Sequence, residues 1–199
     1  EANPELTWRD VKHILASSAR QVDAGRAAVT INDLIVEPAW TTNAAGYRFH
    51  NWYGFGAVDA ASAVDKAKTY TPGSLGTYLV TPEKNSGTID LAINELVPTT
   101  SAINIANSGV IESVRIKLYV KHDRPSSLSV ALVSPSGTRS VLLTPYNGYQ
   151  SWKTTNYVEL ASNAFYAENI QGDWKLEITD HVSGVTGTLN QWRLTVYGH

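Results

Sequence analysis

The sequence predicts a mainly β protein, a jelly-roll-like antiparallel β-sandwich preceded by a short segment with two helices. Apolar side chains alternate with charged or aromatic ones from residue 114 to residue 121, which is typical of a strand with one buried face. Short apolar runs separated by turn residues continue from 77 to 197, as in all-β sandwiches and barrels. Apolar residues at helical spacing over residues 8–19 indicate that the chain starts with a helix instead.

The composition excludes several classes of function. With 199 residues and 43% hydrophobic content, the chain can bury a sizeable core. A formal net charge of −2 provides no basic field, so we expect no nucleic-acid partner. No apolar run is long enough to span a bilayer, and no signal peptide opens the chain. Because cysteine is absent, disulfides and thiolate zinc sites are excluded.

The first helix is expected from about Trp8 to Ala19. Thr7 is the expected N-cap residue, and Asp10 can complete a capping box with it. The apolar stripe of this helix consists of Trp8, Val11, Ile14, Leu15 and Ala19. Such a stripe predicts that one face of the helix is buried against another part of the protein.

The stretch Asn32–Tyr47 is predicted to be irregular, because Pro38, Asn43 and Gly46 interrupt it. A second helix is expected to start at Asp59. Its stripe of small residues consists of Ala57, Ala60, Ala61, Val64 and Ala67. Two short helices have too little apolar surface to bury against each other alone. Since the chain also begins at Glu1 and contains no methionine, we expect a longer precursor whose upstream part covers them.

Thr69–Gly76 is rich in Thr, Pro, Gly and Ser, which marks a linker between domains. We therefore expect two domains, residues 1–70 and residues 71–199. A turn is expected at Ser134–Thr138, where proline presets φ and glycine accepts a positive φ. The expected strands are Thr77–Thr81, Thr88–Ile93, Ala102–Ala106, Val114–Lys121, Leu128–Leu132, Val141–Leu143, Tyr157–Leu160, Trp174–Thr179 and Leu189–Tyr197.

Two stretches in the first 70 residues resemble one enzyme family. Asn3–His13 (NPELTWRDVKH) resembles the helix near the end of the catalytic domain of kexin- and furin-type subtilisin-family serine proteases, the proprotein convertases. Tyr53–Ala60 (YGFGAVDA) is similar to the Tyr-Gly-x-Gly-x-x-Asp-Ala signature that closes that domain. The resemblance implies that residues 1–70 are a two-helix remnant of an α/β subtilisin-like catalytic domain.

The β half is similar to the P domain that follows the catalytic domain in those enzymes. The similarity rests on Leu132–Leu143, Gly172–Ile178 and Gly187–Gly198. The sequence departs from convertases at Arg124–Ser127, where their P domains often carry Arg-Gly-Asp. It also only echoes their Gly-Phe-x-x-Trp-x-Phe segment, around Trp152. These departures indicate a bacterial secreted relative rather than a eukaryotic hormone-processing enzyme.

The resemblance implies a parent protein that is a serine endopeptidase, located outside the cell or in the periplasm. Its Asp, His and Ser triad would lie upstream of Glu1, because no Gly-Thr-Ser-x-Ala-x-Pro turn occurs in this chain. We therefore expect the chain alone to be inactive, and we assign it no catalytic, cofactor-binding or metal residues. The implied partners are the upstream catalytic domain, which the P domain docks on and stabilises, and the parent's protein or peptide substrates. The resemblance also implies structural calcium in the parent.

Several side chains invite a site assignment but have a plainer interpretation. His13 is expected at the surface or at an interface. The other histidines, His50, His122, His181 and His199, show no spacing of a metal site. Asp123, Asp173 and Asp180 could approach one another at one end of the sandwich and bind calcium. Turns favour aspartate for its backbone hydrogen bonds, however, and we prefer this interpretation.

The aromatic residues leave a second class of function open, a stand-alone jelly-roll module that binds carbohydrate or protein on its loops. Those in loop-like segments are Trp40, Trp52, Tyr146, Tyr149 and Trp152. They could form a platform for a glycan or peptide, or fill the joint between the two parts of the chain. Trp8, Trp174 and Trp192 are instead expected to pack in the core or at an interface.

Overall fold

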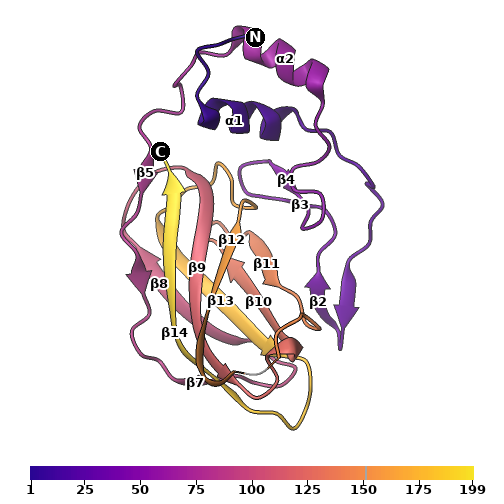
Figure 1. Ribbon diagram of the computed structural model, residues 1–199, viewed down its shortest axis with the longest axis vertical. Helices are drawn as coiled ribbons and strands as arrows, with labels where there is room; N and C mark the ends of the chain where they lie inside the picture. The colour runs from indigo at the N-terminus through magenta and orange to yellow at the C-terminus, as the bar shows by residue number, and fades with distance from the viewer. Residues whose placement is uncertain (151) are drawn as a thin grey trace.

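Two antiparallel β-sheets packed face to face form the larger part of the computed structural model, and both helices lie at one end of them (Figure 1). The structure describes residues 1–150 and 152–199, with the side chains of residues 153–156 excepted. The C-terminus lies at the same end of the sandwich as helix α1. This end is therefore where the N-terminal segment and the sandwich meet.

The larger sheet has six strands and the smaller has four. The six-stranded sheet contains β12 (Trp152–Ser162), β9 (Ile111–His122) and β14 (Gly187–Gly198) in this order, with β5 (Leu79–Val80), β6 (Lys84–Asn85) and β7 (Leu91–Ala92) along the outer side of β14. The four-stranded sheet has the order β11 (Arg139–Leu143), β10 (Leu128–Val133), β13 (Gly172–Asp180) and β8 (Thr99–Ile105). A short 3-10 helix, Pro125–Ser127, joins β9 to β10. The mainly β fold predicted from the sequence is confirmed.

The core lies between the two sheets and follows the predicted alternation. Ile116, Leu118 and Val120 of β9 are buried, whereas Arg115 and Lys121 on the other face of the strand are exposed. The expected burial of two tryptophans is also confirmed. They are Trp174 and Trp192, and both have 0% of their surface exposed. Every expected strand has a counterpart, and β9, β12 and β14 extend beyond the bounds that the pattern predicted.

Helix α1 (Trp8–Ser18) begins as the sequence predicted. Thr7 and Asp10 form the full capping box. Asp10 is fully buried and also accepts the backbone N–H of Gly73 at 3.1 Å. Burial acts to raise the pKa of Asp10, but hydrogen bonds from Thr7 and Gly73 outweigh it and hold the pKa below its usual value. One side chain thus caps the helix and anchors the linker.

Helix α2 (Ala60–Thr69) starts after Asp59, whose side chain accepts the Ser62 N–H as an N-cap. Gly56 of the preceding motif has a φ of +130°, and a Cβ at this position would lie 2.3 Å from the carbonyl oxygen of Arg20. The backbones of Arg20 and Ala57 bond to each other at this place. A glycine is therefore required for the close contact that leads the chain into α2.

The prediction that Asn32–Tyr47 is irregular is wrong for part of this stretch. Strands β1 (Val29–Ile31) and β2 (Leu34–Glu37) form a hairpin, and β3 (Thr41–Thr42) pairs with β4 (Arg48–Phe49). The hairpin turns at Asn32 and Asp33, with φ values of 49° and 62°. Asn and Asp are the residues that best accept two successive positive φ values, so what looked like a loop signal is the turn of a hairpin.

The helices share only a small cluster, Ile14 with Ala63 and Ala67. Trp8 has 65% of its surface exposed and is therefore not part of the core, although its ring meets that of Tyr78 edge-on at 6.0 Å. Its expected place at an interface stays a prediction. Much of the apolar face of α1 consequently lies at the surface. Within residues 1–150 and 152–199, neither helix combines the length and the apolar character that crossing a bilayer requires.

Candidate functional site

The candidate site is the surface along which the N-terminal segment lies on the end of the sandwich. We call it the joint, and define it by Arg9, Lys12, His13 and Asn43 on one side and Glu112, Tyr166 and Glu168 on the other. Glu112 belongs to the start of β9, and Tyr166 and Glu168 lie between β12 and β13. These three sequence-distant side chains are buried.

A buried ion pair forms the first part of the joint. Glu112 has 2% of its side chain exposed, and Arg9 of α1 has 11%. Arg9 donates from Nε to Glu112 Oε1 at 3.0 Å, and a second nitrogen of its guanidinium group also donates to this oxygen. His199 Nδ1 lies 3.0 Å from the same oxygen, and Lys12 Nζ donates to the Glu112 backbone carbonyl at 3.0 Å. Helix α1, strand β9 and the C-terminus therefore meet at Glu112.

Glu112 is expected to make the joint sensitive to acid. Burial acts to raise its pKa, but hydrogen bonds from Arg9 and His199 outweigh burial and hold the pKa below the ordinary 4.5. Such a carboxylate stabilises the fold above its unfolded pKa, and the stabilisation is lost as the pH falls through the lower folded pKa. The difference in unfolding free energy between wild type and Glu112→Gln should therefore shrink below about pH 4.5. Urea unfolding of both proteins at about pH 6 and about pH 3.5 measures it, and an unchanged difference would contradict the assignment.

Tyr166 forms the second part of the joint. Its hydroxyl lies 3.0 Å from Nδ1 of His13, and the rings of Tyr47 and Phe55 pack edge-on against it at 5.0 and 5.6 Å between centroids. Burial raises the pKa of Tyr166 and lowers the pKa of His13. Both groups are therefore neutral at neutral pH, and the hydroxyl can donate to the imidazole. His13 is an interface residue, as expected.

Asn43 forms the third part, although the sequence marked it only as a breaker. Its Nδ2 donates to the carbonyl oxygens of Ala164 and Tyr166 at 2.9 and 2.8 Å. The next backbone N–H, of Ala44, donates to Glu168 at 3.0 Å, and Ser134 Oγ donates to the same carboxylate at 2.6 Å. Asn43 and Glu168 are both buried. The loop before β4 is thus bonded to the connection between β12 and β13, and the Ala44 N–H also lies 3.2 Å from Thr138 Oγ1 in the turn between β10 and β11.

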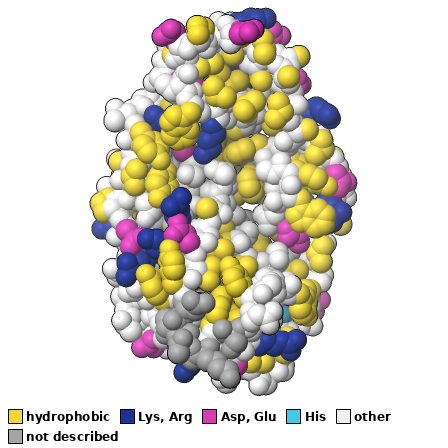
Figure 2. Space-filling view, in the orientation of Figure 1, with side chains coloured by type: hydrophobic (Ala, Val, Ile, Leu, Met, Phe, Trp, Pro, Cys, Tyr) yellow, Lys and Arg dark blue, Asp and Glu magenta, His cyan; other side chains and the backbone are white. Residues whose placement is uncertain are grey.

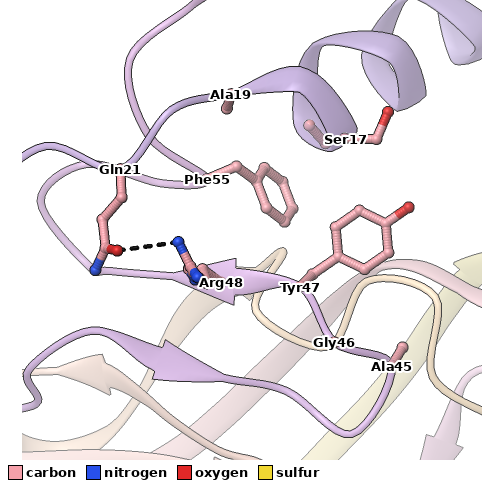
Figure 3. Close-up of a pocket in the computed structure, with 9 residues that line it drawn as sticks. Ser17, Ala19, Gln21, Ala45, Gly46, Tyr47, Arg48 and Phe55 are labelled. Atoms are coloured by element: carbon pink, nitrogen blue, oxygen red, sulfur yellow. Dashed lines mark hydrogen bonds between the residues drawn. The ribbon is translucent and has the colours of Figure 1, made fainter.

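A groove of about 370 Å³ opens beside the joint, between the end of α1 and the Ala45–Arg48 stretch (Figure 3). Tyr47 and Phe55 reach into the space between helix and strand, and Arg48 Nη1 donates to Gln21 Oε1 at 3.1 Å. Ser17 in its wall donates to the Ile14 carbonyl oxygen and accepts from Lys66. No histidine contacts this hydroxyl among the described residues, so we assign no acyl transfer to the groove.

The three aspartates considered for calcium are not brought together. Asp173 and Asp180 lie at opposite ends of β13, opposite Asn104 of β8 and Leu128 of β10 respectively. Asp123 lies 3.5 Å from Thr186 Oγ1. Across the described part of the chain, no group of three or more His, Asp or Glu side chains is arranged to hold a metal ion.

Two of the remaining histidines, His122 and His181, lie next to Asp180, and His50 lies apart from them. His122 Nε2 is 3.2 Å from Asp180 Oδ2 at the far end of the sandwich, where both side chains are fully buried. His181 Nε2 lies 2.8 Å from Ser129 Oγ, and burial lowers the pKa of His181. His50 packs among aromatic rings. His122 and His181 therefore belong to one end of the sandwich, and His50 belongs to the N-terminal segment.

The loop aromatics form two groups rather than one platform. Trp40 stacks on Tyr53 at 6.0 Å, and the pair contacts Trp52 through His50. The second group consists of Tyr149 and Trp152, whose rings are 4.9 Å apart. Trp152 is the first residue of β12 and is buried, so its placement in a loop is corrected. Tyr146 is exposed.

Glu112 and the pair at the far end were missed, although the sequence carries a signal for them. Glu112 and His122 are in phase with the buried residues of β9, one at each end of that strand. Asp180 is likewise in phase with Trp174 of β13. An ionisable residue on the buried face of a strand requires a polar partner. This requirement identifies Glu112 and the His122–Asp180 pair from the sequence pattern. Tyr166 carries no such signal, because no regular element surrounds it.

The comparisons with known proteins agree with this geometry. Residues 111–196 match the family described as the proprotein convertase P-domain. The chain is 31% identical to the Aeromonas extracellular serine protease of Aeromonas sobria, over 100% of its own length and 39% of that protein. It is 32% identical to human proprotein convertase subtilisin/kexin type 5, over 100% of its length and 11% of the convertase. The crystal structure of the Aeromonas sobria serine protease superposes with a TM-score of 0.90 and 31% identity, over 100% of this chain and 41% of that one.

The chain thus spans about two fifths of the length of the Aeromonas sobria protease that it matches. Its similarity includes the N-terminal segment and the joint, since all 199 residues are covered. The sequence motifs, the sandwich and the comparisons point to the same relatives. The chain therefore carries a proprotein convertase P domain and matches the C-terminal part of subtilisin-like serine proteases, among them the Aeromonas proteases and the proprotein convertases.

Proposed function

We propose that this chain is the C-terminal part of an extracellular serine endopeptidase, in which the sandwich docks on the catalytic domain and stabilises it. The joint is the observation that carries the proposal. It fastens a segment that resembles the end of a catalytic domain to the sandwich, through the Arg9–Glu112 ion pair and the Asn43 amide. Buried polar contacts whose groups are hydrogen-bonded fix one arrangement of the N-terminal segment relative to the sandwich.

In this proposal residues 1–70 complete the catalytic domain and residues 71–199 are the P domain. The exposed apolar residues of α1 support the division. Trp8, Val11 and Leu15 line a shallow groove of about 410 Å³, together with Val58, and all four are exposed. Exposed apolar patches mark interaction surfaces. The upstream part of the catalytic domain is the proposed cover of this groove.

The proposal places the catalytic triad upstream, so the chain alone is expected to hydrolyse no peptide bond. The proposed location is extracellular, because the Aeromonas sobria relative is described as an extracellular protease. Protein or peptide substrates would bind the upstream part, and structural calcium is proposed there as well. The Aeromonas sobria protease has been solved in complex with a chaperone, ORF2, so a chaperone is a further proposed partner of the parent.

Truncation tests the docking role. We expect the upstream catalytic part that ends at residue 71 to have a melting temperature at least about 5 °C below that of the same protein extended to residue 199. Without the sandwich, the side chains on the catalytic side of the joint lose their partners and become exposed to solvent. Thermal unfolding and hydrolysis of a peptide substrate are measured on both proteins. A variant of the longer protein with Asp65→Ala, which removes an exposed ion pair, serves as the control. Equal melting temperature and equal activity of the two lengths would refute the proposal.

A further inference from the structure

His13 of α1 contacts both the second helix and the sandwich. Its ring packs against the ring of Tyr70, which ends α2, at 5.6 Å between centroids. On the sandwich side it packs against Tyr166 at 6.1 Å, and its Nδ1 lies 3.0 Å from the Tyr166 hydroxyl. A change in the charge of His13 therefore acts on the place where the two helices and the sandwich meet.

The surroundings of His13 suit a neutral imidazole. Burial lowers its pKa, and repulsion from Lys66 and from a protonated His199 lowers it further. Attraction to Asp10 and Glu112 acts in the opposite direction but is outweighed. A neutral ring offers Nδ1 as an acceptor to the hydroxyl beside it, whereas a protonated ring has only donors.

Both carboxylates that act on His13 are engaged by other groups. Asp10 accepts the hydrogen bonds that cap α1 and the N–H of the linker residue Gly73. Glu112 is paired with the guanidinium group of Arg9. Because each carboxylate already has its donors, a proton on His13 would be only weakly compensated.

Cations already lie around the place that a charged His13 would occupy. Lys12 Nζ is 5.8 Å from the centroid of the Tyr166 ring, the same ring on which His13 packs. Lys66 of α2 donates to Ser17 near the end of α1. Lys and Arg side chains are also visible at the level of α1 in the space-filling view (Figure 2). A further positive charge among them would be repelled.

We propose that protonation of His13 loosens α1 from the sandwich in mildly acidic solution. Protonated His13 is better accommodated when α1 has moved away and water surrounds the ring. A histidine whose pKa is lowered in the folded protein stabilises the fold above its ordinary pKa of 6.5, and this stabilisation is lost as the pH falls through the lower folded pKa. Glu112 responds only below about pH 4.5, so the two effects occur in separate pH ranges.

The contact lies within this chain, so the inference does not depend on the proposed docking on a catalytic domain. Amide hydrogen exchange of the 199-residue chain tests it, with each rate divided by the intrinsic rate of that amide at the same pH. We expect protection of the α1 amides to fall at least about threefold between about pH 7.5 and about pH 5.0, with a smaller change in β9. An NMR titration of the His13 ring should give a pKa below 6.5.

Two neutral variants assign the effect to His13. His13→Asn keeps an acceptor for the Tyr166 hydroxyl but cannot gain a proton, so protection of α1 should change less than about 1.5-fold over the same pH range. His13→Gln is the second neutral variant, because asparagine is a weaker helix former. His181→Asn is the matched control. Burial also lowers the pKa of His181, but it lies at the other end of the sandwich, so this variant should keep the wild-type response in α1.

A loss of α1 protection in acid that disappears in both neutral variants and persists in His181→Asn would support the proposal. Unchanged protection of α1 in the wild type, or an equal loss in the neutral variants, would overturn it. A His13 pKa at or above 6.5 would do the same, because the folded protein would then not disfavour the charged ring.

Discussion

Replacing Glu112 by alanine is expected to lower the free energy of unfolding by about 3–5 kcal/mol, because it leaves the Arg9 guanidinium group buried without its partner. The change also removes the acceptor of His199. The loss should be concentrated at the joint, so the backbone amides of α1 should exchange with solvent faster than those of β9. Urea unfolding measures the total loss, and hydrogen exchange locates it.

The matched control for this prediction is Asp65→Ala. Asp65 pairs with Lys68 at 2.9 Å on the surface of α2, and both side chains are mostly exposed. Exposed pairs of this kind contribute only about 0–1 kcal/mol. A Glu112→Ala effect as small as that of the control would show that the buried pair does not hold the helix on the sandwich.

Replacing Trp174 by alanine is expected to cost about 3–5 kcal/mol, which is the usual range for removal of a large aromatic side chain from a core. Trp174 has 0% of its surface exposed, packs edge-on against Phe165 at 5.2 Å and donates from its indole nitrogen to the Ile170 carbonyl at 3.0 Å. The lost volume lies between the two sheets, where neighbouring side chains cannot close in without breaking strand register.

Trp8→Ala is the control for this second prediction. Trp8 is the same residue type but is 65% exposed, so its removal from the isolated chain should cost less than about 1 kcal/mol. Denaturant unfolding of both variants provides the comparison. Similar losses would mean either that the core is not centred on Trp174 or that Trp8 is packed more tightly than its exposure indicates.

The β part was predictable because its pattern is local. The alternation of Ile116 and Leu118 with charged residues needs no knowledge of the partner strand, and burial follows it residue by residue. The helix starts were equally local, since Thr7 and Asp59 cap the residues that directly follow them. The hairpin turning at Asn32 and Asp33 was missed because Asn and Asp are also typical of irregular loops.

The joint was not predictable from local pattern, because its contacts link distant parts of the chain. Asn43 bonds to residues that follow it by more than 120 positions, and Arg9 is separated from Glu112 by 103. Family resemblance indicated that the two parts belong together, but only the folded structure identifies the side chains that join them. Glu112 is the exception, since a carboxylate in phase with a buried strand face requires a partner wherever that partner lies.

The most direct measurement is a double-mutant cycle between Arg9 and Glu112, made of the two alanine variants, their combination and the wild type. The two charges contact each other across the joint, so their losses should not add. We predict a coupling energy of about 2 kcal/mol at about pH 7, with the double variant more stable than the sum of the single losses implies. A coupling within about 0.3 kcal/mol of zero would contradict the claim that this pair fastens the N-terminal segment to the sandwich.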